Sequence, residues 1–345
     1  MQTGSQETMS FDIVTGGAGF IGSHMVDRLL AAGRRVRVID NFSNGSPRNL
    51  AHHEGRRDLE VLNLDLADHP AVEGSFKGAE RVFHLAALAD IVPSIENPRA
   101  YFRSNVDGTF NALDQSVKYG VRRFIYAASS TCYGIPDHYP TPETAEPRPK
   151  YPYALTKFLG EQLVMHWAEV YKLPAVSLRM FNVYGPRART SGTYGAVFGV
   201  FLAQLLAGKP LTIVGDGTQT RDFTYVTDVV DAFLTAAEAG VSGAVYNVGS
   251  GGTYSVNRLV ELLGAKDIVH IPKRPGEPDC TWADTAKIER ELNWRARVPF
   301  DRGVISMLQD IELWREAPVW TPEKIAEQTR TWFKLLSPDS ASTKA

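Results

Sequence analysis

The feature that most constrains this chain is a repeated pattern of short apolar runs, each followed by a segment of helix length. The runs typical of buried strands are FDIVT (11–15), RVRVID (35–40), LEVLNLD (59–65), AERVFHLA (79–86), RRFIYAAS (122–129) and PAVSLRM (174–180). The helix-length segments include SHMVDRLLAAG (23–33) and ALTKFLGEQLVMHWAEVYK (154–172). Apolar strands that alternate with helices predict a parallel sheet covered on both faces, with right-handed crossovers.

A glycine-rich turn, TGGAGFIGSH (15–24), joins the first predicted strand to the first predicted helix. Gly16 permits a tight turn, Gly19 lets the backbone approach a pyrophosphate, and Gly22 lets the helix pack close to the strand. A glycine turn alone has weak specificity, but its place between strand and helix indicates a dinucleotide site.

Acidic residues follow two of the predicted strands. Asp40 ends the second strand, where a carboxylate can accept hydrogen bonds from ribose hydroxyls. A carboxylate there repels a 2′-phosphate, so NAD is favoured over NADP. The alternative interpretation is that Asp40 only caps the end of the strand. Asp65 ends the third predicted strand, and either accepts a hydrogen bond from an adenine amine or caps a turn.

Tyr153 and Lys157 stand four residues apart in YPYALTK, at the start of a predicted helix. That spacing puts both side chains on one helix face. An ammonium close to a phenol favours the phenolate, so Tyr153 becomes a usable base near neutral pH. Taken alone, this spacing is common on solvated helix faces.

Together these motifs resemble the extended short-chain dehydrogenase/reductase family, in its branch of nucleotide-sugar epimerases and dehydratases, and within it the UDP-glucose and UDP-N-acetylglucosamine 4-epimerases. The resemblance runs from about residue 11 to about 315. Its markers are GGAGFIG, HLAA (84–87), SNVDGT (104–109), ASSTCYG (128–134), YALTK, LRMFNVYGP (178–186), GDGTQTRDFTYV (215–226) and RPGEPDCTWAD (274–284).

The resemblance implies a Rossmann-like, doubly wound parallel sheet with a smaller C-terminal α/β substrate domain. We expect a disordered lead-in over residues 1–10 and an NAD-binding domain over 11–181, to which a segment of about 222–248 returns. We expect a mainly substrate-binding domain over 182–330 and a disordered tail over 337–345. The resemblance also implies a homodimer built by helices near 100–119 and 153–172.

The resemblance implies site residues as well. Ser129, Tyr153 and Lys157 are the implied catalytic residues. The implied NAD-binding residues are Gly16, Gly19, Phe20, Ile21, Asp40, Asn41, Asn44, Asp65, Leu66, Leu85, Ala86, Ala87, Asn105, Tyr153 and Lys157. The implied substrate-binding residues are Ser129, Ser130, Phe181, Asn182, Arg221, Arg274, Glu277 and Thr281.

Some of these residues have specific implied roles. Asn182, Arg221 and Arg274 match residues that bind the substrate diphosphate, and Glu277 matches an acid on the nucleotide ribose. Thr281 matches a gate beside the sugar C2 substituent, where a small residue admits N-acetyl hexosamines.

The two positions that directly follow Ser129 distinguish the reactions of the family. The 4,6-dehydratases carry an Asp-Glu pair there and the uronate decarboxylases a Glu at the second position, whereas this chain has Ser130 and Thr131. Neither hydroxyl is an acid or base at pH 7. The sequence therefore predicts 4-epimerisation of a nucleotide-diphosphate hexose of the UDP-glucose type, with N-acetylated forms tolerated.

Three alternatives stay open. A UDP-uronate 4-epimerase is one, because Arg187 and Arg189 in GPRART could meet a C6 carboxylate. Another nucleotide-sugar oxidoreductase is the second. A non-enzymatic NAD-binding scaffold is the third, although the presence of Ser129, Tyr153 and Lys157 argues against it.

Composition limits the partners. A formal net charge of −2 provides no bulk basic surface for nucleic acid or anionic membrane. We find no apolar run of the roughly 18 residues that a membrane span needs. Two cysteines make no disulfide framework, which fits the cytoplasm, and the histidines show no metal-binding motif, so no metal is predicted.

Overall fold

The computed structural model describes residues 10–188 and 197–337, and its centre is a seven-stranded sheet. In spatial order the strands are β11 (Ala244–Val248), β6 (Ala175–Met180), β5 (Arg123–Ser129), β4 (Ala79–His84), β1 (Phe11–Thr15), β2 (Val36–Asp40) and β3 (Leu59–Asn63). All neighbouring pairs are parallel. The chain order reverses between β1 and β4, and ligands of such sheets bind beyond the strand carboxyl ends at this point. The predicted Rossmann-like α/β fold is confirmed.

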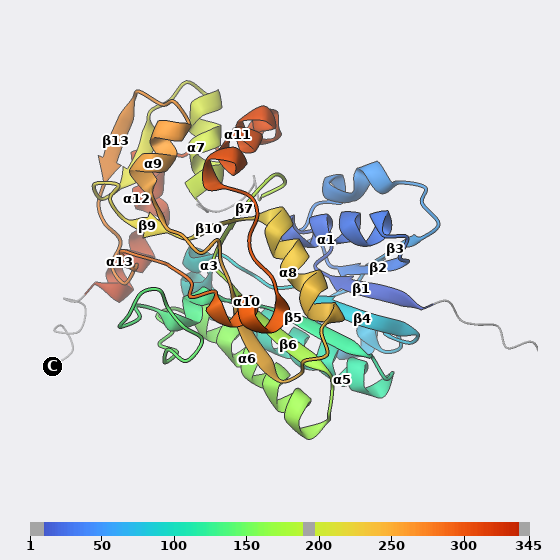
Figure 1. Ribbon diagram of the computed structural model, residues 1–345. Coiled ribbons are helices and arrows are strands. Elements are labelled where there is room, and N and C mark those ends of the chain that lie inside the picture. Colours follow the sequence, from blue (N-terminus) through green and yellow to red (C-terminus); the bar gives the residue numbers. More distant parts are fainter. Residues whose placement is uncertain (1–9, 189–196, 338–345) are drawn as a thin grey trace, which may run out of the picture.

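Alternate side chains of the strands enter two separate cores. On one face, Val14 and Ile125 pack with α1 (Phe20–Ala31) and α8 (Val226–Glu238). On the other, their neighbours Ile13 and Phe124 pack with α5 (Gly108–Lys118) and α6 (Pro152–Val170). Figure 1 shows the sheet between these two helix layers. Successive strand residues point to opposite faces, so a strand covered on both sides must be apolar throughout.

The chain leaves the sheet after β6 and returns to it with α8 and β11. β11 pairs with β6 in a register that places Ala244 opposite Val176. Helix α8 and strand β11 therefore lie with the first half of the chain, whereas β10 (Phe223–Tyr225) pairs with β7 (Asn182–Tyr184). The return of the whole segment of about 222–248 stays a prediction. The domain limits at 181 and 330 stay a prediction.

A smaller α/β region lies beside the carboxyl ends of the central strands (Figure 1). Its short strands are β7 (Asn182–Tyr184), β8 (Leu211–Val214), β9 (Thr220–Arg221), β10 (Phe223–Tyr225), β12 (Tyr254–Ser255) and β13 (Ile268–Ile271). Its helices include α7 (Val197–Leu206), α9 (Val256–Leu262), α11 (Phe300–Gln309), α12 (Pro322–Gln328) and α13 (Arg330–Leu336), whereas α10 (Ala286–Leu292) packs on the core beside α8. Aromatic side chains such as Tyr184, Phe198 and Trp314 form its core.

Several predicted element boundaries were wrong, and three of them have a local cause or divide an element. The first helix begins at Phe20 rather than Ser23, because Gly19 already has the extended backbone of an N-cap. β3 ends at Asn63, because Asp65 accepts a hydrogen bond from the Ala67 amide and turns the chain. The helix expected near 100–119 is divided into α4 (Pro98–Phe102), a π-helical turn at 103–107, and α5.

The predictions of a disordered lead-in and tail cannot be compared with the structure over most of their length. Residues 1–9 and 338–345 lie outside the described residues.

Candidate active site

The glycine turn brings the first helix close to the end of β1. Gly16 has φ +67°, a conformation that favours glycine. A Cβ at Gly22 would lie 2.1 Å from the Gly16 carbonyl oxygen, so a larger residue would push α1 away. The N-terminus of α1 therefore opens onto the adjoining cavity with its first amides available to an anion.

Asp40 lies at the end of β2 beside this turn. Its carboxylate accepts hydrogen bonds from the amides of Ala18 (2.9 Å) and Phe42 (2.8 Å). Burial raises the pKa of Asp40, and these two hydrogen bonds oppose that rise. A carboxylate has further lone pairs, which suit ribose hydroxyls, while its charge would repel a 2′-phosphate. The cradle of Gly16, Gly19 and Gly22 together with Asp40 therefore fits NAD.

A cavity of about 620 Å³ brings most of the predicted site residues together. From the NAD set it is lined by Gly16, Gly19, Phe20, Ile21, Asp40, Asn41, Asn44, Asp65, Leu66, Leu85, Ala86, Ala87, Tyr153 and Lys157. From the substrate set it is lined by Ser129, Ser130, Phe181, Asn182, Arg221, Arg274 and Glu277.

Two predicted contact residues do not line the cavity. Asn105 holds the backbone of Leu88, accepting from its amide at 2.8 Å and donating to its carbonyl at 3.0 Å. Thr281 donates to Asn182 Oδ1 at 2.7 Å and accepts from the Asp222 amide at 3.1 Å. Thr281 thereby holds the lining residue Asn182. The direct contacts that the resemblance implies for Asn105 and Thr281 stay a prediction.

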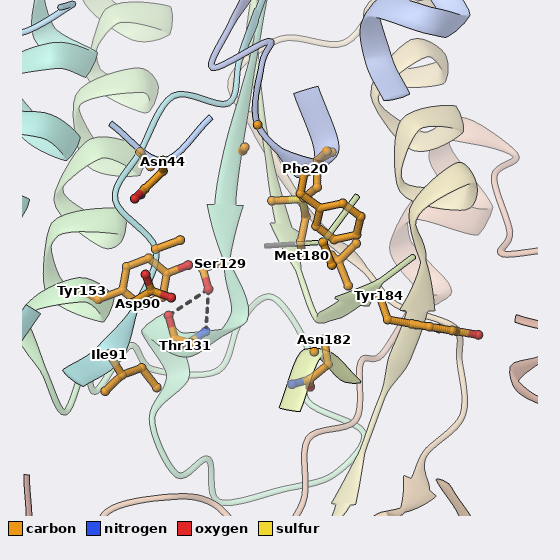
Figure 2. A pocket seen from close by; sticks show the side chains of 18 of the residues that line it. Phe20, Asn44, Asp90, Ile91, Ser129, Thr131, Tyr153, Met180, Asn182 and Tyr184 are labelled. Atoms are coloured by element: carbon orange, nitrogen blue, oxygen red, sulfur yellow. Dashed lines mark hydrogen bonds between the residues drawn. The ribbon is translucent and has the colours of Figure 1, made fainter. Parts of the chain in front are cut away.

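The three predicted catalytic residues meet where α6 crosses the end of β5. Gly160 permits this approach, since a Cβ there would lie 2.2 Å from the Tyr126 hydroxyl. Tyr153 shares a side-chain hydrogen bond with Ser129, and the hydroxyls of Ser129 and Thr131 are 2.8 Å apart. Figure 2 shows Tyr153, Ser129 and Thr131 gathered on one side of the pocket, with Asn182 on the other.

Burial dominates the electrostatics of the Tyr–Lys pair. It lowers the pKa of Lys157 to about 7, while the charge of Glu161 opposes this shift. The Lys157 ammonium lies 4.5 Å from the centroid of the Tyr126 ring. Burial also raises the pKa of Tyr153, against the hydrogen bond with Ser129.

The expected lowering of the Tyr153 pKa is therefore not found in the protein alone. A desolvated phenolate is costly, and burial also weakens the charge of Lys157. The positive charge of an oxidised nicotinamide would favour the phenolate once the cofactor is bound.

The two arginines share one carboxylate at the other end of the cavity. Arg274 Nη1 lies 3.4 Å from Glu277 Oε1, and Arg221 Nη2 lies 3.8 Å from the same oxygen. Because Thr281 donates to Asn182 Oδ1, the amide nitrogen of Asn182 is left to donate to another group. Two guanidinium groups and one amide can together receive a diphosphate.

Sequence reasoning gave no role to the lining residues Trp320 and Trp332, and to Asp90 it gave only a place near the cofactor and the sugar. Asp90 lies close enough to Tyr153 for its charge to raise the phenol pKa. Its place just after HLAA was a usable signal, because that segment follows the end of β4. The two tryptophans lie beyond the region of resemblance, so no motif pointed to them.

Arg187 is not available for a sugar carboxylate. Its guanidinium donates to Asp27 and to the Asn49 carbonyl, and it contacts His24 Nδ1 at 2.9 Å. It is not among the cavity residues. Arg189, the other arginine considered for this role, lies outside the described residues.

Within the described ranges, one group has metal-ligand geometry. Ligand atoms of Asp27, His52 and His53 lie within 4.8 Å of one another. Both histidines contact Asp27 Oδ1, and Arg187 contacts the other oxygen. This arrangement already places a cation on the carboxylate, and the expectation of no metal stays a prediction.

Fold and site together define a dinucleotide-binding enzyme of the Tyr–Lys type. The family model described as the NAD dependent epimerase/dehydratase family matches residues 13–249, and the chain belongs to that family. The predictions of family membership and of NAD as cofactor are therefore confirmed.

Individual relatives include enzymes of different reactions. The UDP-glucose 4-epimerase of Mycolicibacterium smegmatis is 35% identical, over 86% of this chain and 97% of the relative. A UDP-N-acetyl-alpha-D-glucosaminuronate decarboxylase of Bacillus cytotoxicus is 33% identical, over 86% of this chain and 96% of the relative. The solved UDP-glucose 4-epimerase of Thermotoga maritima with UDP-glucose is 36% identical, with a TM-score of 0.81, covering 88% of this chain and 98% of that one.

Among the described residues, no helix has both the length and the apolar composition needed to span a membrane.

Proposed function

We propose that this chain is an isomerase that catalyses NAD-dependent 4-epimerisation of a nucleotide-diphosphate hexose. The observation that carries the proposal is the grouping of Ser129, Tyr153 and Lys157 on one cavity wall, with hydroxyls at Ser130 and Thr131. The 4-epimerases among the relatives support the same reaction.

Tyr153 is the proposed base. It takes the proton of the sugar O4 through Ser129, whose hydroxyl accepts a hydrogen bond from O4–H and donates to the Tyr153 oxygen, with which it already shares a hydrogen bond. NAD, when bound, accepts a hydride from C4 and returns it. Lys157 stabilises the phenolate from the same helix face. Tyr153 gives the proton back after the hydride returns, so acid and base are regenerated in each turnover.

Inversion requires the 4-keto sugar to present its second face without leaving the site. The substrate diphosphate, held by Arg221, Arg274 and Asn182, anchors the nucleotide while the hexose turns. Contacts remote from C4 thus retain the intermediate, a use of binding energy away from the reacting atom.

The strand-end turn argues against dehydration and decarboxylation. Those reactions need an acid or base beside C5 or C6, and Ser130 and Thr131 offer only hydroxyls. Asp90 is a lining acid from another segment, so the product must be examined for changes at C5 and C6 as well as C4. The hydrogen bonds of Arg187 to Asp27 and Asn49 remove one of the two arginines that favoured a uronate, and the other, Arg189, lies outside the described residues.

The experiment is product analysis by proton NMR. UDP-glucose, UDP-N-acetylglucosamine and UDP-glucuronate are each incubated with the protein, with and without added NAD, beside the Tyr153→Phe variant. We expect inversion at C4 of a hexose or N-acetylhexosamine, and at least a thousandfold loss in the variant, about the scale of general acid–base catalysis. A 4-keto or C6-altered product would replace epimerisation by a reaction in which Asp90 is the acid.

We also propose a homodimer. The helices that the resemblance implied carry exposed apolar side chains: Phe102 on α4, Phe110 on α5 and Leu155 on α6, each 45–48% exposed. A four-helix contact with a second copy would cover them.

A further inference from the structure

The C-terminal segment, residues 311–337, lies against the candidate site. Trp314 is fully buried in the core of the smaller region, and Gln204 of α7 donates to the Trp320 carbonyl at 2.7 Å. The segment is therefore anchored on the smaller region before α12 and α13 begin. Both Trp320 and Trp332 then line the cavity.

Trp332, on α13, holds the stretch that bears Arg274. Its indole nitrogen donates to the Pro275 carbonyl at 2.8 Å. The Arg274 guanidinium carbon lies 5.6 Å from the centroid of the Trp332 ring, within reach of a cation–π attraction. One side chain, only 2% exposed, thus contacts both the backbone after Arg274 and its charged group.

The same ring also reaches the catalytic half of the molecule. Its centroid lies 6.3 Å from that of Tyr151, which precedes α6 and stands two residues before Tyr153. Helix α13 also contacts α3 (Ile91–Glu96), whose first residues line the cavity. Trp332 is therefore packed between the arginine end of the cavity and the start of the catalytic helix.

We infer that α13 is part of the substrate site and that Trp332 is the positioning residue that orients Arg274 toward the substrate diphosphate. The inference rests on the proposed function, because it assumes a nucleoside diphosphate in the cavity. Trp332 acts through Arg274, since a buried ring beside the guanidinium restricts its rotamers before ligand arrives. An arginine ordered in advance loses less conformational freedom when it binds phosphate.

The test is titration of the NAD-loaded full chain with UDP by calorimetry, for the wild type, Trp332→Ala, Arg274→Ala and the double variant. We expect Trp332→Ala to raise the Kd for UDP about tenfold, a loss of about 1.4 kcal/mol. The double variant should bind no more weakly than Arg274→Ala alone, because the two residues act as a unit. Trp332→Phe keeps a ring beside Arg274 and should recover most of the affinity.

Lys334→Ala is the matched control, because Lys334 is exposed on the same helix. It should bind UDP as the wild type does. Turnover adds a second readout: the KM for the nucleotide sugar should rise in Trp332→Ala while kcat stays within about twofold. A Trp332→Ala protein that keeps wild-type affinity, or effects that add in the double variant, would overturn the inference.

The two proposals fail in different ways. If Trp332→Ala weakens UDP binding as expected but the wild type inverts no sugar, the inference on Trp332 is kept and the proposed epimerase activity is wrong. Normal epimerisation with unchanged UDP affinity in Trp332→Ala would do the reverse. If Trp332→Ala has a lowered melting temperature and has lost NAD, while Trp332→Phe has neither defect, the UDP affinity of Trp332→Phe replaces that of Trp332→Ala as the test of the inference.

Discussion

At the scale of single residues, His84 at the end of β4 is held neutral beside the site. It is 1% exposed and lies between two hydroxyls, Thr15 Oγ1 at 2.8 Å and Thr109 Oγ1 at 3.0 Å. Thr109 donates to the Asn105 carbonyl, so its oxygen is left to accept from the His84 Nε2–H. Burial, with a smaller effect of the Lys157 charge, lowers the pKa of His84 to about 3.

This pKa predicts acid sensitivity. Because the folded pKa lies below the unfolded value of 6.5, the unfolded chain binds the proton first, and stability falls as pH drops below 6.5 toward 3. We expect His84 to contribute a loss of about 2 kcal/mol between pH 6.5 and pH 5, at about 1.4 kcal/mol per pH unit. Urea unfolding at several pH values, for the wild type and for His84→Gln, measures it. An equal pH slope in both proteins would contradict the prediction.

At the scale of elements, one buried ion pair joins α6, the helix that carries Tyr153 and Lys157, to the sheet. Glu161 of α6 binds Arg179 of β6 at 2.6 Å and accepts from Ser177 at 2.9 Å. Arg179 also donates to the Tyr133 hydroxyl at 2.8 Å, in the turn η3 (Ser130–Tyr133) that follows Ser129. The helix with Tyr153 and Lys157 and the turn beside Ser129 are thus held by the same guanidinium.

Glu161→Gln should therefore reduce both stability and turnover. It leaves the buried Arg179 charge without its partner, a loss of about 3–5 kcal/mol in the free energy of unfolding. Urea unfolding measures this. The matched control, Glu146→Gln, removes an exposed partner of Arg148 and should leave the unfolding midpoint unchanged.

A double variant separates stability from catalysis at the same pair. Glu161→Met with Arg179→Met removes both charges and should recover much of the stability. Its turnover should stay low, because the turn after Ser129 has lost its hydrogen bond to Arg179. Full turnover in the double variant would show that the pair contributes only to stability.

At the scale of the whole molecule, the apolar side chains on α4, α5 and α6 indicate where a second copy would bind. Phe110 is 45% exposed and packs edge-on against Trp167 of α6, with ring centroids 5.2 Å apart. Phe102 and Leu155 are also exposed, on α4 and α6, and α6 contacts both α4 and α5. Exposed apolar groups on neighbouring helices are the kind of surface that a partner covers.

Phe110→Glu should convert the dimer to a monomer, because a carboxylate would be buried at the contact without a partner. Light scattering of the purified full chain measures the mass. Leu313→Glu is the control, since Leu313 is 49% exposed on η4 (Ile311–Trp314), away from these helices. A wild-type protein that is monomeric at all accessible concentrations would remove the dimer.

Most of the central fold and the NAD end of the site could be predicted from the sequence. The glycine turn, Asp40 and the Tyr153–Lys157 spacing depend on backbone geometry within a few residues, and each leaves a local pattern. Continuous apolar strands likewise record that both sheet faces are covered. The limits of elements were less predictable, as at Phe20 and Asn63, because caps and turns end them.

What the sequence by itself determined is the parallel sheet, the dinucleotide cradle and the residue types available for proton transfer, because local spacing encodes all three. Only the tertiary structure decided that Thr281 donates to Asn182 and that Arg187 is held by Asp27. It also decided that Trp332 packs beside Arg274. These outcomes depend on contacts between segments far apart in the chain, and burial at such contacts, rather than residue spacing, sets the pKa of Tyr153 and Lys157.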